Sequence, residues 1–260
     1  MSAGLVTCTR PSTIAGALDK AGDGLFDYQT ATVLQTILAH RDLHDRALLV
    51  DPSGEWRAYK PVVVEAKARR GKPEAGAGTA VHEAVSALLA DRDVSRISGS
   101  VLSAASAVLD TLDANGYKII DNERLVACLD TFPEPFAGTT DLVLAQGDRL
   151  LIGDVKTVAE LGGERFSALK WATQVAVYAS SRPCDEDYEP KRDQWGRPKI
   201  DVSRIQNGWD IPLDRQVGVI VEVERDTGRT RLHNVDLEVG AEAVSLACQV
   251  RALRRERVLV

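Results

Sequence analysis

The sequence predicts an α/β fold with a mixed central sheet flanked by helices, and a helical addition at the N-terminus. The composition is that of a chain able to bury a core without disulfides, because 44% of its 260 residues are hydrophobic and 27% are charged. Strand-like segments alternate with segments of helical periodicity, in the order helix, three strands, helix, two strands, helix. Turn signals containing glycine separate neighbouring strands, which favours hairpins within the sheet.

Residues 1–75 are expected to form the helical extension. Helices are predicted over 12–20 and 27–48, with Ser12 and Asp27 as caps. Asp-Pro-Ser-Gly at 51–54 lies between two short apolar runs, which predicts a hairpin there. The sequence does not decide whether this extension is a lid, a guide for the substrate or a partner surface.

Residues 76–260 are expected to form the main domain. Residues 70–78 are rich in glycine, which indicates a loop or hinge before a helix capped by Thr79. A polar stretch at 182–212 contains four prolines and reads as an insertion. The predicted helices are 79–90, 97–115, 164–181 and 239–256, and the predicted strands are 117–129, 136–145, 149–156, 217–224 and 230–237.

Charge and cysteine usage limit the class of protein. The net charge of −6 excludes a uniformly basic nucleic-acid coat, although a focused basic groove stays compatible with it. No apolar run approaches 18 residues, and Met1–Arg10 lacks a basic flank leading into an apolar core, so neither a membrane span nor a secretory signal is expected. The four cysteines are scattered and form no CxxC pair, which predicts reduced thiols in a cytoplasmic protein.

The most informative stretch is a predicted hairpin that carries two aspartates. Gly147-Asp148 suits a two-residue turn, and the register that follows pairs Gln146 with Arg149 and places Asp141 opposite Asp154. Facing side chains have Cβ atoms roughly 4.5–5.5 Å apart. Two carboxylates at that separation repel, unless one is protonated, they share a cation, or the register differs.

A shared cation is the explanation with chemical consequences. Lys156 lies two residues beyond Asp154 and therefore on the same face, where it offsets one charge. Two aspartates and water suit Mg²⁺ or Mn²⁺, which prefer oxygen ligands. A lysine beside such a metal can hold a water and stabilise developing negative charge. The alternative is a hairpin whose aspartates sit at the sheet edge, in water.

Two helical patterns accompany this hairpin. His82 follows Gly78 by four residues and is expected in the first turn of a helix. Gln174 and Tyr178 are i, i+4 neighbours on another helix, and Lys170 extends their stripe by one turn. Taken singly, either pattern is also that of an ordinary helix.

Together, GxxxH, GxxD, DxK and QxxxY in this order resemble the PD-(D/E)XK nuclease superfamily. More narrowly, they resemble the RecB-like exonucleases, a branch with phage-encoded and CRISPR-adaptation members. The resemblance covers residues 78–180 well and 217–237 loosely. It implies a restriction-endonuclease-like core and a metal-dependent DNA exonuclease that acts in recombination, repair or DNA degradation. A nuclease-fold DNA-binding or scaffold subunit without catalysis, and a structure-specific endonuclease, remain alternatives.

The resemblance also implies roles for residues of the metal site. His82, Asp141 and Asp154 would bind Mg²⁺ or Mn²⁺, with the carbonyl of Val155 as a further ligand. Lys156 would position the attacking water. Glu123, on the preceding strand, matches a frequent acidic position of these enzymes and is a further candidate.

DNA is the partner that the resemblance implies. Gln174 and Tyr178 would orient the helix at the site and contact the DNA backbone, and Lys170 and Trp171 beside them are further candidates for DNA contact. The basic and aromatic insertion at 182–212, with Trp195 and Trp209, is interpreted as a DNA-contact loop, a solvated insertion or an oligomer contact.

Cofactors and protein partners follow from what the motifs lack. Members with an iron–sulfur cluster carry one upstream cysteine and a tight trio near the C-terminus, and this sequence lacks the trio, so no cluster is expected. No GxxxxGK[ST] loop occurs, so unwinding would come from a separate helicase, and a single-strand annealing protein is another candidate partner. The motifs leave oligomerisation open.

Overall fold

The computed structural model describes residues 4–17, 33–51, 55–70, 73–162 and 164–255. The chain divides into two compact units. The larger unit contains Met1–Asp19 and Ala77–Val260, and the smaller unit is Lys20–Gly76. The first residues therefore belong to the larger unit, whereas the sequence assigned them to the helical extension.

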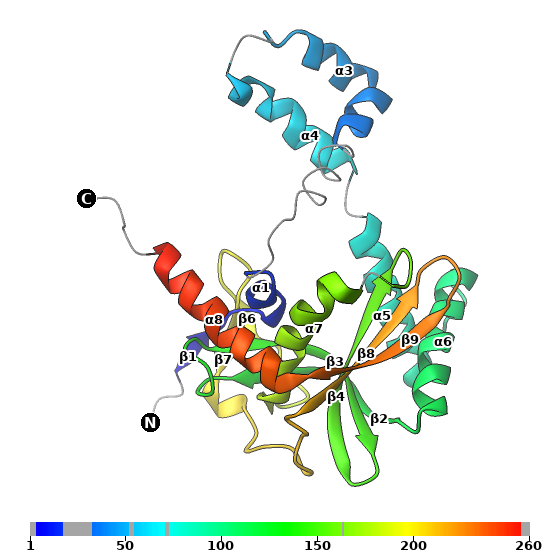
Figure 1. Ribbon diagram of the computed structural model, residues 1–260, viewed down its shortest axis with the longest axis vertical. Coiled ribbons are helices and arrows are strands. Elements are labelled where there is room, and N and C mark those ends of the chain that lie inside the picture. Colours follow the sequence, from blue (N-terminus) through cyan, green and yellow to red (C-terminus); the bar gives the residue numbers. More distant parts are fainter. Residues whose placement is uncertain (1–3, 18–32, 52–54, 71–72, 163, 256–260) are drawn as a thin grey trace. The chain divides into compact units, whose positions relative to one another are not determined.

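A six-stranded mixed sheet forms the centre of the larger unit, which confirms the predicted α/β class (Figure 1). The strand order is β5-β2-β3-β4-β8-β9. Only β4 and β8 run parallel among these neighbours, and the other pairs are antiparallel. The strands are β2 (Lys118–Cys128), β3 (Phe136–Gln146), β4 (Arg149–Val158), β5 (Arg182–Pro183), β8 (Val217–Glu224) and β9 (Thr230–Asp236).

Helices cover both faces of this sheet, because its central strands are apolar on both sides. On β4, Leu151 and Val155 share a buried cluster with α5 (Pro73–Leu89) and α6 (Gly99–Ala114). Ile152, which points to the opposite face, packs with α7 (Glu164–Ala179). The alternation along β4 therefore determines which residues face α7, and Asp154 and Lys156 are on that side.

The last helix, α8 (Leu237–Arg255), packs closely on α7. A Cβ added to Gly240 would lie 2.3 Å from the carbonyl oxygen of Ala172. Glycine at this position lets the two helix backbones approach each other more closely than any side chain would allow.

The predicted hairpin of β3 and β4 is confirmed. Gln146 pairs with Arg149, and the same register continues to Leu142 and Gly153. Gly147 has a φ of +64°, which glycine adopts without steric cost in a tight turn. Asp141 and Asp154 follow directly after the last pair of this ladder.

The insertion at 182–212 forms a second small sheet with the N-terminus. Its order is β1-β7-β6, so the chain start is tied to the insertion by antiparallel pairing. The helix predicted to begin after Ser12 begins at Pro11 instead, since proline is well suited to the first helical position. The elements are β1 (Leu5–Thr7), α1 (Pro11–Ala15), β6 (Lys191–Arg192), β7 (Pro198–Asp201) and η2 (Val202–Arg204).

Helix α5 begins at Pro73, six residues earlier than the predicted cap at Thr79. Proline at the helix start and the alanines at 75, 77 and 80 favour the helix, and each interior glycine costs only about 1 kcal/mol against alanine. The expected loop at 70–78 is therefore wrong from Pro73 onward. His82 consequently lies in the interior of α5 rather than in its first turn.

The smaller unit is helical over its described residues. The hairpin predicted around 51–54 is wrong, because the apolar run before it is the end of α3 and the turn that follows, and the run after it forms the short helix η1. Residues 52–54 and the predicted helix start at Asp27 lie outside the described residues. A small core holds the unit together, made of Val33, Ile37, Leu43, Val62 and Ala66. The helical segments are 33–39, α3 (Arg41–Leu48), η1 (Trp56–Tyr59) and α4 (Lys60–Arg70).

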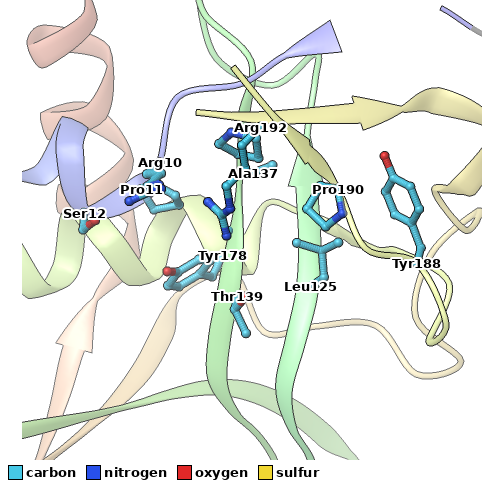
Figure 2. A pocket seen from close by; sticks show the side chains of 12 residues that line it. Arg10, Pro11, Ser12, Leu125, Ala137, Thr139, Tyr178, Tyr188, Pro190 and Arg192 are labelled. Carbon is cyan, nitrogen blue, oxygen red and sulfur yellow. The ribbon is translucent and has the colours of Figure 1, made fainter. Parts of the chain in front are cut away.

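A pocket of about 400 Å³ lies between the N-terminal segment, the central sheet and the insertion (Figure 2). Arg10 and Arg192 line it together with Tyr178 from α7 and Gly138 from β3. Across the described segments, every helix is too short or too polar to cross a membrane.

Candidate metal centre

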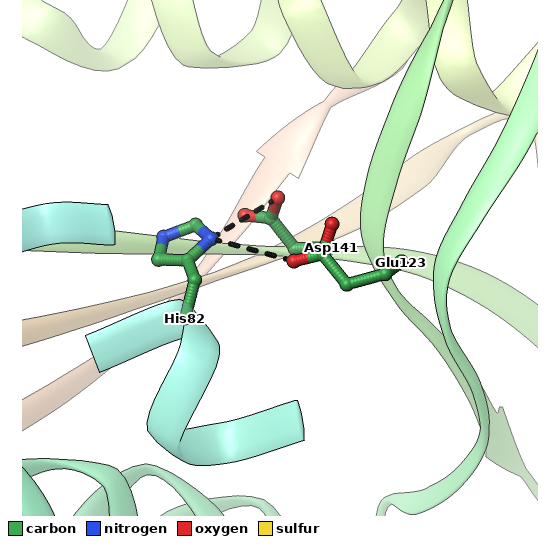
Figure 3. A group of neighbouring side chains, drawn as sticks. All are labelled: His82, Glu123 and Asp141. Carbon is green, nitrogen blue, oxygen red and sulfur yellow. Dashed lines mark ion pairs between the residues drawn. The ribbon is translucent and has the colours of Figure 1, made fainter. Parts of the chain in front are cut away.

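Three side chains from three elements form a candidate metal-binding group (Figure 3). His82 comes from α5, Glu123 from β2 and Asp141 from β3, and their ligand atoms lie within 4.8 Å of one another. Nδ1 of His82 is 3.4 Å from Oδ1 of Asp141 and 4.0 Å from Oε1 of Glu123. One imidazole and two carboxylates are a donor set that divalent cations accept.

Both nitrogens of the His82 ring face oxygen atoms. Nε2 lies 3.0 Å from the carbonyl oxygen of Val155, on the side of the ring away from the carboxylates. Burial acts to lower the pKa of His82, but the hydrogen bond and charge of Asp141, with the charges of Asp154 and Glu123, outweigh it and raise this pKa to about 9. The metal-free site therefore holds a doubly protonated imidazolium at neutral pH, and this cation partly neutralises the two acids.

Glu123 has an unusual backbone conformation. Its φ is +51°, which a non-glycine residue rarely adopts, and the pairing of β2 with β3 shifts register a few residues earlier, between Ile119 and Asp121. Burial and the charge of Asp141 raise the pKa of Glu123 above its ordinary value. Backbone strain of this kind clusters at functional sites, and here it occurs at an acid of the candidate metal group.

Asp141 is held in place by the neighbouring strand. Its Oδ2 accepts the backbone N–H of Val155 at 2.9 Å. Burial tends to raise the pKa of Asp141, but the hydrogen bond and charge of His82, the charge of Lys156 and the N–H of Val155 hold it below its ordinary value. The carboxylate is therefore ionised at neutral pH, as a metal ligand must be.

Asp154 belongs to a second group, on the α7 side of the sheet. It is fully buried, and its Oδ1 accepts Nε2 of Gln174 at 3.1 Å. Its Oδ2 lies 2.6 Å from Nζ of Lys156 and forms a buried ion pair with it. Lys156 in turn donates to Oε1 of Gln174 at 3.2 Å, so one glutamine holds both charged residues.

The charges of this second group depend on each other. Burial raises the pKa of Asp154 above its ordinary value, with the charge of Asp141 acting in the same direction and Lys156 opposing it. Burial tends to lower the pKa of Lys156, but the charges of Asp154 and Asp141 outweigh it and raise this pKa. Lys156 is therefore a cation that compensates the two aspartates, one of the three explanations that the sequence left open.

The chemistry of the donor set fits a divalent cation. Asp141 presents an ionised oxygen near His82 and Glu123, and the buried Oδ2 of Asp154 is paired with the ammonium of Lys156. Among the described residues, Asp154 lies outside the group whose ligand atoms are within 4.8 Å of one another. The carbonyl of Val155, expected as a ligand, contacts Nε2 of His82.

Gly138 and Tyr178 connect this site with the pocket in Figure 2. A Cβ on Gly138 would lie 2.9 Å from the side chain of Pro11 and 3.3 Å from the ring of Tyr178, so the glycine makes room for both. The hydroxyl of Tyr178 accepts Nε2 of Gln174 at 3.4 Å. Burial raises the pKa of Tyr178, and its hydroxyl therefore keeps its proton at neutral pH.

The remaining residues proposed for DNA contact differ in exposure. Lys170 is exposed on α7, one turn before Gln174. Trp171 is 7% exposed and packs in the core beneath α7, near the ring of His233. Trp209 packs against the same core and donates Nε1 to the carbonyl of Ser181 at 3.2 Å. Trp195, by contrast, is 71% exposed.

Sequence reasoning missed a buried acid on the strand beside Lys156. Glu222 of β8 pairs in register with Lys156, is 1% exposed, and lies 2.8 Å from Nε2 of His233. The available signal was an acidic residue inside the otherwise apolar run Val217–Val223. A buried carboxylate of this kind requires a partner, and His233 provides it.

The four cysteines are buried free thiols. They divide between two core clusters, with Cys8 and Cys184 in one and Cys128 and Cys248 in the other. Burial raises the pKa of Cys8 to about 12, assisted by nearby cysteines. Cys8 is therefore a packing residue with little thiolate character.

The comparisons with known proteins assign this chain to no family. A scan against protein-family models finds no match, and neither does a search of curated proteins. One similar solved structure is described as "Crystal structure of SSO0001", with 13% identity, a TM-score of 0.32, and coverage of 64% of this chain and 63% of that chain. The chain thus spans less than two thirds of that structure's length, and so weak a likeness carries no argument about function.

Proposed function

We propose that this protein is a Mg²⁺- or Mn²⁺-dependent nuclease that hydrolyses phosphodiester bonds of DNA and acts from DNA ends. The observation that supports it is the juxtaposition of a His82–Glu123–Asp141 group with a buried Asp154–Lys156 pair. Membership of the PD-(D/E)XK superfamily, in its RecB-like branch, is part of the same proposal, because the chain carries the four motifs of that branch in order. They end at His82, Asp141, Lys156 and Tyr178.

His82, Glu123 and Asp141 would hold the cation, with Asp154 adjacent. A bound Mg²⁺ or Mn²⁺ supplies Lewis acidity and lowers the pKa of a coordinated water. With a carbonyl on one side of its ring and carboxylates on the other, His82 can ligate through one nitrogen and donate its N–H from the other.

Lys156 would act on the reacting groups. Its Nζ carries a proton at neutral pH and is 24% exposed at its side chain, so a water or a phosphate oxygen can reach it. A cation at this position orients the attacking water by hydrogen bonding and offsets the negative charge that develops on the phosphate.

Gln174 and Tyr178 would be positioning residues. Gln174 holds the carboxylate of Asp154 and the ammonium of Lys156 at once, and also reaches the hydroxyl of Tyr178. Tyr178 lines the pocket beside the site, where a neighbouring phosphate of the strand could bind.

The test is a cleavage assay on end-labelled linear duplex, linear single strand and closed circular DNA, each with Mg²⁺, Mn²⁺ or EDTA. We expect metal-dependent loss of linear DNA. Lys156→Ala should lower the rate by about 100-fold or more, because it removes the cation that positions water.

Lys118→Ala is the matched control, since it removes an exposed lysine at the far end of β2. Full activity of Lys156→Ala would contradict its role. Cutting of closed circles would favour a structure-specific endonuclease, and DNA binding without cleavage would favour a scaffold subunit.

The burial of the thiols also bears on the cellular setting. Buried free thiols suit a reducing compartment, so we propose that the protein works in the cytoplasm. DNA is the proposed partner, and a separate helicase or a single-strand annealing protein would supply unwound strands.

A further inference from the structure

The insertion contains a short, well-braced hairpin, which we name the Trp195 hairpin and define as residues 191–201. The carboxylate of Asp193 accepts the backbone N–H of Trp195 at 2.9 Å and that of Arg197 at 2.8 Å. It also accepts Nε of Arg197 at 2.7 Å. Gly196 completes the turn with a φ of +74°. The tip is therefore held by its own hydrogen bonds rather than by packing.

An indole is displayed at this tip. Trp195 is 71% exposed, and the guanidinium of Arg197 lies 5.0 Å from its ring. Trp171 and Trp209 pack in or against the core, whereas Trp195 exposes its ring to solvent. A braced aromatic ring flanked by arginine is a platform on which nucleic-acid bases stack.

Two further arginines contact the backbone next to Trp195. Arg10 donates to the carbonyl oxygen of Gly196 at 2.5 Å, and Arg192 donates to the same oxygen at 3.2 Å. One carbonyl oxygen thus holds two guanidinium groups close together. Their mutual repulsion would be relieved by an anion, and arginine binds phosphate in a fork geometry.

The local charge favours the same ligand. Residues 191–201 carry four basic side chains against two acids, Asp193 and Asp201, and Asp193 is engaged with Arg197. The chain as a whole is acidic, at −6, so this hairpin is a focused basic patch. Glu189 is an exposed acid nearby and does not reverse the balance.

The pocket joins this patch to the candidate metal centre. Arg10 and Arg192 line it together with Thr139 and Tyr178 (Figure 2). Tyr178 contacts Gln174, which holds Asp154 and Lys156. A strand lying in the pocket would therefore lie beside Tyr178, whose hydroxyl contacts the glutamine that holds the residues proposed for cleavage.

We infer that the Trp195 hairpin and Arg10 form a subsite for an unpaired DNA strand, in which a backbone phosphate binds between Arg10 and Arg192 and a base stacks on Trp195. One part of this inference rests on the proposed function, namely that the bound strand runs toward the metal centre. It makes a single strand, or the frayed end of a duplex, the form of DNA that the protein selects.

The test is a binding measurement in EDTA, so that it does not depend on cleavage. Fluorescence anisotropy of a labelled oligonucleotide is compared for single-stranded and blunt duplex forms. Trp195→Ala should weaken single-strand binding about tenfold, and duplex binding much less, because only an unpaired base can stack fully on the ring. Trp195→Phe should keep most of the affinity but lose the quenching of tryptophan fluorescence that the strand causes.

The phosphate contact has its own readout. Arg192→Ala should reduce the slope of log affinity against log salt by about 0.7, the value for one phosphate contact on a single strand. Lys118→Ala removes the same charge at the far end of β2 and should leave that slope unchanged. Unchanged single-strand affinity of Trp195→Ala, or equal losses on single strand and duplex, would overturn the inference and leave the hairpin as a surface for a protein partner. If the protein cleaves DNA but gives one of these two binding results, the proposed function stands and the subsite does not. If the variants bind as expected but the protein cleaves no DNA, the subsite stands and the proposed function does not.

Discussion

At the scale of single residues, the candidate metal centre is a balance of charges in a partly buried space. Asp141, Glu123 and Asp154 repel one another, and His82 and Lys156 compensate them in the absence of a metal. The positive φ of Glu123 adds backbone strain of order 1–3 kcal/mol at the same place. A cation that binds three of these groups would replace the compensating proton on His82.

Metal binding should therefore stabilise the folded protein. At a Mg²⁺ or Mn²⁺ concentration about 100 times the dissociation constant, the expected gain is about 2.7 kcal/mol, measured as a rise in melting temperature. Asp141→Asn should remove most of this rise, because the amide lacks the charge that the cation binds. Asp148→Asn, the same change at the exposed turn of the β3–β4 hairpin, should keep the metal-induced rise in melting temperature. An equal rise in both variants would place the metal elsewhere.

The affinity for metal should depend on pH through His82. A pKa raised to about 9 means that folding stabilises the imidazolium, a contribution that is complete below about pH 6.5 and lost as pH rises through 9. A metal must displace one of these protons, so its affinity should increase with pH, up to about tenfold per unit, and level off above 9. Calorimetric titration with Mn²⁺ between about pH 6.5 and 8.5 measures this, and His82→Gln should flatten the dependence. A flat profile in the unaltered protein would mean that His82 is not a ligand.

At the scale of elements, the site is assembled by a hairpin, a strand and two helices. The β3–β4 hairpin carries Asp141 and Asp154, β2 brings Glu123 beside it, and α5 and α7 approach from opposite faces with His82 and Gln174. The position of His82 depends on α5 continuing past the two glycines that precede it.

Gly78→Ala tests where α5 begins. In the interior of a helix, with no atom within 4 Å of the added Cβ, alanine should stabilise the protein by about 0.5–1 kcal/mol. If Thr79 capped the helix instead, Gly78 would lie outside it, and alanine would bring no gain in helix propensity. Denaturant unfolding of the two proteins measures the difference.

Gly240→Ala tests the contact between α7 and α8. Its Cβ would meet the carbonyl of Ala172 at 2.3 Å, and backbone cannot move aside as a side chain can. We expect a loss of about 1–3 kcal/mol in the free energy of unfolding. Gly99→Ala, at the start of α6 with no atom within 4 Å, is the matched control and should show no loss. Equal stability of the two variants would contradict the close packing.

At the scale of the whole molecule, the chain has two cores rather than one. The larger unit contains every residue of the candidate metal centre, and the smaller unit, Lys20–Gly76, has its own cluster around Leu43. A unit of this size buries too little apolar surface for more than marginal stability.

Leu43→Ala should therefore affect the smaller unit selectively. Leu43 is fully buried, and its truncation should cost about 2–5 kcal/mol. Hydrogen exchange should show lost protection at 33–48 and 60–70, while the metal-induced rise in melting temperature persists. Leu144→Ala, in the core beneath β3, should give the opposite pattern. Loss of protection throughout the chain after Leu43→Ala would indicate a single cooperative core.

Local pattern by itself determined the central sheet and the order of its elements. The register of the β3–β4 hairpin follows from Gly147 and the apolar run on either side, and the predicted proximity of Asp154 and Lys156 is confirmed at 2.6 Å, whereas Asp141 joins His82 and Glu123. These are contacts of short sequence separation, so the period of two along a strand and the turn chemistry suffice to predict them.

Only the tertiary structure decided how the distant parts come together. Arg10 and Arg192 donate to the same carbonyl oxygen, although they are far apart in the chain. Glu222 pairs with His233 on the strand beside Lys156. The backbone of Glu123 has a positive φ, and its side chain lies in the candidate metal group. Local propensity also misjudged the start of α5, where helix formation prevailed over the glycines, and the hairpin predicted around 51–54, whose described flanks are not strands. Such features depend on packing between segments far apart in the chain, and the periodicity of one segment holds no information about which other segment will cover it.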